Sequence, residues 1–290
     1  MVDLEIGALL DITPADGRHA ILVEIDTALG STPRGCDACM LVTAGEIAGT
    51  IGGGHLEFHA IDVARSMLLE GTGHQTMELP LGPMMGQCCG GHVTLSFEAL
   101  DPATAGRLRR REKGLIEARP AVLVFGLGHT GHALAAMLSL LPFAVTLVDD
   151  REEVLAGLPA NCAVRLLEDP VDAVADAPAG AAFIILTHSH ALDYRLTDAA
   201  LLRRDAAYVG MIGSKTKRRR FESQFLRGDG TNAVLGELTC PIGGADVDDK
   251  RPEIIASLTA AELVRCFARR AARARNRGRA PVLAGLSKGA

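Results

Sequence analysis

The sequence lacks several features that would place it in other classes of protein. It has no tryptophan, two tyrosines and eight phenylalanines, so aliphatic side chains must fill its core. No apolar run approaches the roughly 20 residues that a membrane-spanning helix needs. The formal charge of −5 argues against a dedicated nucleic-acid-binding protein. The N-terminus lacks the basic start and the cleavage site of a signal peptide, so we expect a cytoplasmic protein.

Cysteine is present in an odd number, seven, which does not indicate a disulfide framework. Cys36 and Cys39 have C-x-x-C spacing, but they lead into an expected strand and no second pair follows at zinc-ribbon distance. Cys88 and Cys89 are adjacent and stand within the glycine-rich stretch GQCCGG. Two interpretations of this stretch remain open: a glycine turn that carries two thiols, or a site for a soft metal or for sulfur.

The length of 290 residues favours two domains, and the first hundred residues predict a small α+β domain. A helix is expected at 55–70, ended by Gly71. The expected strands form a mostly antiparallel sheet and lie at 20–27, 39–44, 47–51, 74–80 and 91–98. Residues 101–120 are charged and are bounded by prolines. We interpret them as a linker that is helical in part.

From residue 121 to 272, apolar strands alternate with helices, a pattern typical of a doubly wound parallel sheet. The predicted fold class is therefore α/β, with a small N-terminal α+β domain followed by a Rossmann-like domain. Strands are expected at 121–126, 143–149, 162–167, 181–187 and 206–212, and helices at 129–141, 191–204, 214–226 and 252–272. Residues 273–290 are basic and rich in Gly and Ala, and we expect a flexible tail there.

The segment GLGHTG follows a strand and opens a helix, which is the context of a dinucleotide-binding fingerprint. In this pattern Gly126 allows the tight turn, Gly128 lets the backbone approach a phosphate, and Gly131 lets helix and strand pack closely. Asp149 ends the next strand, where a ribose-binding carboxylate belongs. His129 stands inside the phosphate turn, and the charges after Asp149 have mixed signs. The pattern therefore does not decide between NAD and NADP, and a purely structural glycine turn remains an alternative.

The segment GTIGGGHLE places Gly52, Gly53 and Gly54 before a helix. Three consecutive glycines can form a nest of N–H groups that suits a phosphate, although a flexible turn is an equally good interpretation. His55 and His59 share a helix face and could pair on a metal. The spacing does not match a zinc protease, and two ordinary histidines remain the alternative.

Two further segments follow strands at the carboxyl edge of the expected parallel sheet, where open α/β sheets bind ligands. THSHALD contains His188, His190 and Asp193, which could take part in acid–base chemistry or bind a ligand. VGMIGSKTK supplies Lys215 and Lys217 for an anion. The alternatives are polar loop residues in the first segment and a solvated helix face in the second.

The order of these motifs along the chain resembles that of the XdhC family, the xanthine dehydrogenase accessory proteins. The resemblance rests on GSTPR, GTIGGGHLE, GQCCGG, FGLGHTGHAL, THSHALD, VGMIGSKTK, CPIG and KRPEIIA. It implies a molybdenum cofactor chaperone that binds molybdopterin, assists exchange of an oxo ligand for sulfur, and helps to insert the cofactor into a molybdenum hydroxylase such as xanthine dehydrogenase. It also implies a cysteine desulfurase as sulfur donor and a homodimer.

Under this resemblance Arg34 and the Gly52–Gly54 nest suit the phosphate of the cofactor, and Cys88 or Cys89 suits the metal or the incoming sulfur. Cys89 is slightly preferred. No residue is assigned a catalytic role. The sequence departs from the family pattern at Cys36 and Cys39, and at the glycine after CPIG. Two alternatives remain: an NAD(P)-dependent oxidoreductase that uses the His and Asp residues of THSHALD as acid–base groups, and a nucleotide-sensing module.

Overall fold

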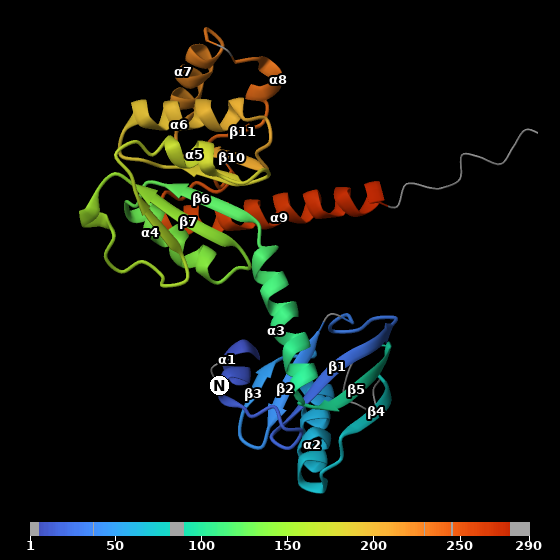
Figure 1. Ribbon diagram of the computed structural model, residues 1–290. Helices are drawn as coiled ribbons and strands as arrows, with labels where there is room; N and C mark the ends of the chain where they lie inside the picture. Colours follow the sequence, from blue (N-terminus) through green and yellow to red (C-terminus); the bar gives the residue numbers. More distant parts are fainter. Residues whose placement is uncertain (1–5, 37, 82–89, 229, 245, 279–290) are drawn as a thin grey trace, which may run out of the picture. The chain divides into compact units, whose positions relative to one another are not determined.

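The computed structural model describes residues 6–36, 38–81, 90–228, 230–244 and 246–278 (Figure 1). The chain divides into two units, Met1–Glu117 and Ala118–Ala290. Each unit has its own sheet and its own hydrophobic core. This arrangement confirms the predicted fold class, a small N-terminal α+β unit followed by a Rossmann-like α/β unit.

The first unit is built on an antiparallel sheet with strand order β3-β2-β1-β5-β4. Each pair of neighbouring strands in this sheet is antiparallel, as the alternating patterns predict. The strands are β1 (Ala20–Leu29), β2 (Cys39–Thr43), β3 (Ile47–Gly49), β4 (His74–Pro80) and β5 (His92–Ala99).

Helices cover both faces of this sheet. Helix α2 (Gly54–Glu70) packs Leu56 and Ala60 against one face, and it ends at Gly71, which has φ 71° and donates its N–H to the Met67 carbonyl. On the other face lie α1 (Ile6–Ile12) and α3 (Pro102–Glu117). Both cores are almost wholly aliphatic, as the scarcity of aromatic residues requires.

Strand β1 carries a β-bulge. Its pairing with β5 shifts register between Ile25 and Thr27. Before the bulge, Ile21, Val23 and Ile25 point into the core beneath α2; after it, Ala28 packs against the same core. The bulge therefore reverses which residues of β1 point inward, because side chains alternate between faces in a regular strand.

Helix α3 occupies the segment for which the sequence predicts a linker. Its Ala105 and Leu108 are buried in a cluster with Leu9 of α1, so the segment belongs to the first unit. Asp101 accepts a 2.7 Å hydrogen bond from the backbone N–H of Thr104, as an N-cap does. The apolar residues three apart explain why this charged stretch forms a helix on the sheet, and the division between units falls after Glu117.

The second unit contains a parallel sheet with strand order β11-β10-β9-β6-β7-β8. The order reverses direction between β6 and β9, the place where doubly wound sheets bind ligands. The strands are β6 (Ala121–Phe125), β7 (Ala144–Asp149), β8 (Ala163–Leu166), β9 (Ala182–Ile185), β10 (Tyr208–Met211) and β11 (Leu238–Thr239).

Helices cover both faces of the parallel sheet (Figure 1). Helices α4 (His129–Ser139) and α9 (Pro252–Gly278) pack on one face. The other face is covered by α5 (Asp172–Asp176), α6 (His190–Leu202), α7 (Lys215–Phe225) and α8 (Asn232–Leu235). A single 3-10 turn, η2 (Glu152–Val154), follows β7.

The boundaries of some elements differ from the sequence expectation. Helix α9 continues to Gly278, whereas the sequence pattern ends the helix at 272 and begins a flexible tail there. Arginine and alanine are both strong helix formers, which explains the extension. The sequence pattern also gave no helix at α1 or α8 and no strand at β11, because these elements are short.

Candidate functional site

A cavity of about 290 Å³ lies in the first unit, between the end of the GSTPR loop and helix α3. Polar groups on its wall include the guanidinium of Arg34, the thiol of Cys39 and the guanidinium of Arg111. Its remaining lining residues are Ile6, Ala38, Thr50, Leu108, Glu112 and Leu115. The wall thus carries two arginines, a cysteine and the acidic Glu112, whose carboxylate accepts a 3.2 Å hydrogen bond from the Gly7 N–H. The arginines and the thiol are groups that can bind an anionic ligand with affinity for sulfur.

Arg111 is held in place at this cavity by partners on β1 and β2. Its Nη1 atom lies 3.2 Å from a carboxylate oxygen of Glu24 and 3.6 Å from Sγ of Cys39. Arg107, one turn earlier on α3, contacts the other Glu24 oxygen at 2.7 Å. Arg34 and Cys39 stand in sequence motifs, whereas Arg111 lies in the segment interpreted as a linker and was not predicted. The helical spacing of Arg107 and Arg111 is the signal that could have found it.

Three glycine motifs of the first unit meet beside this cavity. A Cβ atom on Gly52 would lie 2.6 Å from Cβ of Pro33, so the GSTPR loop packs directly on the GTIGGG loop. A Cβ atom on Gly91 would collide with the Ser31 carbonyl oxygen, and one on Gly30 would lie 3.2 Å from Cα of Gly91. Glycine is therefore required where these backbones touch, and motifs far apart in sequence form one surface.

The predicted phosphate nest at Gly52–Gly54 holds the chain's own carboxylate. All three glycines have positive φ, a conformation that residues with a side chain rarely adopt. The Glu57 side chain accepts hydrogen bonds from the N–H groups of Ile51 at 3.0 Å and Gly53 at 3.1 Å, and from the Thr50 hydroxyl. The nest thus binds an anion, but the anion is internal. Among the three glycines, the Gly53 N–H donates to Glu57 and the Gly52 N–H donates to the Thr50 hydroxyl at 3.0 Å, so a role of this turn toward a ligand phosphate stays a prediction.

Cys88 and Cys89 lie outside the described residues. The chain on either side of them is described, and the N–H of Leu81 donates to the carbonyl of Gly91 at 2.7 Å. This bond joins the two ends of the intervening segment. Its C-terminal end, Gly90 and Gly91, lies against Gly30.

In the second unit the glycine fingerprint has the geometry that its sequence predicts. Gly126 has φ 103°, and a Cβ atom there would collide with the Leu186 carbonyl. A Cβ atom on Gly131 would collide with the Gly126 carbonyl, whereas one on Gly128 meets nothing within 4 Å. Gly126 and Gly131 are needed for packing, and Gly128 leaves open space at the start of α4.

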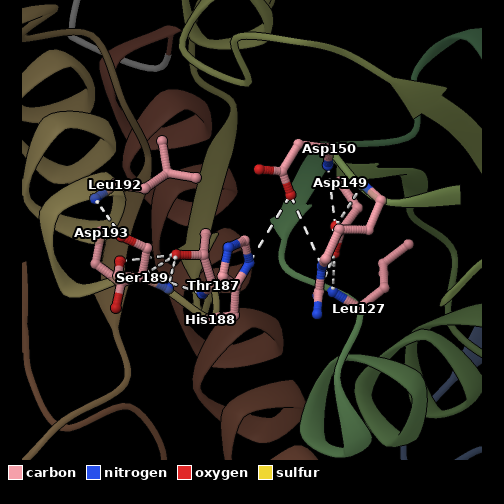
Figure 2. Close-up of polar contacts among 9 residues, drawn as sticks. Leu127, Asp149, Asp150, Thr187, His188, Ser189, Leu192 and Asp193 are labelled. Carbon is pink, nitrogen blue, oxygen red and sulfur yellow. Dashed lines mark hydrogen bonds and ion pairs between the residues drawn. The ribbon is translucent and has the colours of Figure 1, made fainter. Parts of the chain in front are cut away.

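Asp149 lies at the end of β7, and its carboxylate accepts hydrogen bonds from other groups of the protein (Figure 2). It is 2% exposed, and its two oxygens accept five hydrogen bonds from described residues. The donors are the N–H groups of Leu127 at 2.6 Å, Asp150 and Arg151, and the Arg151 guanidinium at 2.9 and 3.0 Å. This carboxylate contacts the glycine turn through the Leu127 N–H, and its predicted role toward a ribose stays a prediction.

The pKa of Asp149 reflects the same contacts. Burial opposes ionisation, but the hydrogen bonds from Arg151 and from the Leu127 N–H outweigh it and hold the pKa of this carboxyl below its ordinary value. A lowered pKa stabilises the fold at every pH above the ordinary carboxyl value of about 3.9, and the stabilisation disappears as the pH falls through the lowered value.

Replacement of Asp149 by Asn should therefore have a pH-dependent effect. We expect the free energy of unfolding to fall by about 2 kcal/mol near neutral pH, because the ionic bonds to Arg151 are lost. The difference from the wild type should shrink only on acidification below the ordinary carboxyl value, as the pH falls through the lowered pKa at which the wild-type carboxyl loses its charge. Urea unfolding of both proteins at several pH values measures it, and a difference that does not vary with pH would contradict this account.

The neighbouring Asp150 and His188 face one another across the carboxyl edge of the sheet. Asp150 follows β7 and His188 follows β9, and His188 Nδ1 lies 3.8 Å from Asp150 Oδ1 (Figure 2). The His188 side chain is 46% exposed and that of Asp150 is 30% exposed, so both remain accessible. His129 begins α4 and Lys215 begins α7, and both are exposed at helix N-termini on this edge.

Asp193 and Lys217 form a buried ion pair. Asp193 is fully buried, and its carboxylate accepts hydrogen bonds from Lys217 Nζ, from the Thr187 N–H at 2.9 Å and from the Thr187 hydroxyl at 2.8 Å. Lys217 Nζ also donates to the Ile212 carbonyl at 2.8 Å. These two residues, which the sequence offered for acid–base chemistry and anion binding, instead join α6 to α7. His190 is exposed at the start of α6.

The histidines that could pair on a metal lie on the surface of the first unit. His55 and His59 are both exposed on α2, and no cluster of three or more His, Cys, Asp or Glu side chains within the described ranges could hold a metal ion. Among the helices of these ranges, none combines the length and the apolar character needed to cross a membrane.

The fold and the motifs define a two-unit α/β protein in which a Rossmann domain follows a small antiparallel domain. The chain belongs to the XdhC family. The model of the XdhC Rossmann domain matches residues 122–263, and the model of the XdhC and CoxI family matches residues 15–79.

Two known proteins show the extent of the similarity. The uncharacterized protein YqeB of Escherichia coli (strain K12) is 26% identical over 249 residues, which is 84% of this chain but 42% of YqeB. The chain thus spans less than half the length of that relative. A crystal structure described as a xanthine dehydrogenase from Bacillus halodurans is 18% identical, covers 92% of this chain and 97% of its own, and has a TM-score of 0.75. At 18% identity, the similarity to the Bacillus halodurans structure supports the fold alone.

Proposed function

We propose that this protein binds the molybdenum cofactor and holds it for a molybdenum hydroxylase of the xanthine dehydrogenase type. The observation that carries the proposal is the cavity of the first unit, where Arg34, Cys39 and Arg111 line one space of about 290 Å³. Membership in the XdhC family supports this class of cargo and client, and the lining of the cavity supports the choice of this place for the cargo.

The groups on the cavity wall match the chemistry of molybdopterin. The cofactor carries a phosphate, which two guanidinium groups can bind through charge-assisted hydrogen bonds. Its metal is held by sulfur, and Cys39 supplies a soft ligand next to Arg111. The volume is at the lower end of the range of about 300–1,000 Å³ for small-molecule sites, so the cavity suits the phosphate and part of the pterin. When bound, the cofactor supplies a molybdenum centre at which an oxo ligand can be exchanged for sulfur.

In this proposal the protein's own residues bind the cofactor and shield it from water. Arg34 and Arg111 hold the phosphate charge, the apolar side chains of α3 exclude water, and no step requires turnover by this protein. In this proposal a cysteine desulfurase donates the sulfur, Cys89 or Cys88 contacts the metal or the incoming sulfur, and the protein acts in the cytoplasm as a homodimer. Gly90, the residue after Cys89, lies beside the GSTPR loop, which supports a thiol role near this surface.

The alternative, an NAD(P)-dependent oxidoreductase, has less support from the geometry. A dehydrogenase of this fold uses the acidic residue after the second strand to bind the ribose. Here that residue, Asp149, is buried and saturated with internal hydrogen bonds. Asp193, the acid–base candidate, is paired with Lys217 in the interior. We therefore place the main function in the first unit.

Substitution of Arg34 by Ala tests this function. We expect the pterin content of the purified variant to fall by about tenfold or more, because one charge-assisted contact to the phosphate is lost. The measurement is the fluorescence of the oxidised pterin and the molybdenum content per mole of protein after co-expression with the cofactor pathway. The matched control is Arg18→Ala, which removes an exposed arginine of the same unit away from the cavity.

Unchanged pterin content in Arg34→Ala, or an equal loss in Arg18→Ala, would overturn the assignment of the cavity. The same assay on Cys88→Ala and Cys89→Ala examines the thiols. If both variants retain the wild-type content of molybdenum and pterin, these cysteines do not bind the cofactor.

A further inference from the structure

The C-terminal part of α9 carries a group of arginines that the family assignment does not explain. The matched range ends at Leu263, which is buried against α4, and the arginines follow directly. In Figure 1 this part of the helix continues beyond the strands of the second unit. The arginines with described side chains are Arg265, Arg269, Arg270, Arg273 and Arg275, all of them exposed.

Four of these arginines line a single groove. Arg265, Arg269 and Arg273 recur every four residues, which places them along one side of the helix, while Arg270 lies on the other side of Cys266. The groove has a volume of about 950 Å³, and its other lining residues are Ala207, Tyr208, Glu237, Thr239, Glu262 and Ala274. A second hollow of about 450 Å³ shares part of this wall and adds Arg204.

The position of the groove separates it from the glycine fingerprint. Ala207 precedes β10 and Glu237 precedes β11, so the groove lies at the amino ends of these parallel strands. The glycine fingerprint lies at the opposite, carboxyl edge. Whatever binds in the groove therefore occupies a second site of this unit.

Positive charge dominates the groove. Within the described part of the chain, none of Arg265, Arg269, Arg270 or Arg273 forms an ion pair. Of the two acidic residues on the wall, Glu262 already accepts hydrogen bonds from the Tyr208 hydroxyl at 2.6 Å and from the Gly243 N–H at 3.1 Å.

We propose that this groove binds an oligophosphate anion of nucleotide size. Four guanidinium groups along the α9 wall of a concave space can bind several phosphate oxygens at once in the bidentate geometry that arginine favours. A volume of about 950 Å³ accommodates a nucleoside triphosphate. The Glu237 carboxylate and the Thr239 hydroxyl, at the edge of the same groove, are suited to sugar hydroxyls. A compact anion fits this shape better than a nucleic acid, for which a chain with net charge −5 is poorly suited.

Calorimetric titration of the full chain with inorganic tripolyphosphate and with ATP tests the proposal. We expect both to bind, with an affinity that falls as the salt concentration rises. The variant Arg269→Ala/Arg273→Ala should lose affinity for tripolyphosphate by about tenfold for each guanidinium removed. The matched control, Arg219→Ala/Arg220→Ala, removes two exposed arginines of α7 and should bind as the wild type does.

The two probes also separate the sources of the phosphate. Tighter binding of ATP than of tripolyphosphate assigns the groove to a nucleotide, and equal binding assigns it to the oligophosphate group alone; both support the proposal. It is overturned if neither probe binds, if the α7 control loses as much affinity as the α9 variant, or if a poly-glutamate peptide binds more tightly than tripolyphosphate. Because the molybdenum cofactor is assigned to the first unit, either proposal can fail without the other.

Discussion

Substitution of Asp193 by Ala is expected to lower the free energy of unfolding by about 3–5 kcal/mol. Asp193 is 0% exposed and Lys217 is 9% exposed, so the substitution leaves a buried ammonium group without its counterion. The N–H and hydroxyl of Thr187 lose their acceptor at the same time. Urea unfolding, followed by circular dichroism, measures the change.

A double variant separates the charge from the packing. In Asp193→Ala/Lys217→Met neither charge is buried, so the double variant should be more stable than Asp193→Ala alone. The long side chain of methionine keeps the contact that Lys217 makes beside Gly213. If the single Asp193→Ala variant loses less than about 1 kcal/mol, the ion pair is not what joins α6 to α7.

A second large effect is expected for the substitution Gly131→Ala, which should lower the free energy of unfolding by about 3 kcal/mol. In an ordinary helix this change is favourable, because alanine has a higher helix propensity than glycine. Here the new methyl group would collide with the carbonyl oxygen of Gly126, a backbone atom of the glycine turn, and would lie 3.2 Å from the Leu186 side chain. Helix α4 would have to move away from β6.

Gly128→Ala is the matched control for this prediction, because it lies in the same fingerprint. Its backbone has φ −71°, which any residue adopts, and an added Cβ meets nothing within 4 Å. We expect its midpoint of thermal unfolding to match that of the wild type. Equal midpoints for Gly131→Ala and the wild type would show that the close approach of helix and strand is not needed.

The sequence predicted those features that depend on backbone geometry. Gly126 and Gly131 were identified because a tight turn and a close helix–strand contact exclude side chains, whatever the rest of the chain does. The alternation of strands and helices predicted the parallel sheet for a similar reason, since burial on both faces requires continuous apolar runs. Gly71 ended α2 where expected because it adopts the left-handed conformation that terminates helices.

The hydrogen-bond partners of charged side chains could not be predicted from the sequence in the same way. Glu57, Asp149 and Asp193 each stand in motifs that suggest ligand binding, and each proves to be bound within the chain. A carboxylate binds whichever donor the fold brings to it, and that choice depends on contacts between distant segments. Arg111 shows the converse, because its spacing from Arg107 is a local signal of a shared helix face, but its place at the cavity follows from the packing of α3 on the sheet.

The bulge in β1 has a consequence for comparison of this chain with distant relatives. Because the register shifts between Ile25 and Thr27, loss of one residue at this point would turn Ala28 and the start of the GSTPR loop to the opposite face of the sheet. The loop could then no longer meet Gly52 and Gly91. A relative that binds the same cargo should therefore keep the number of residues between the core of β1 and the GSTPR motif unchanged, even where the residues themselves differ.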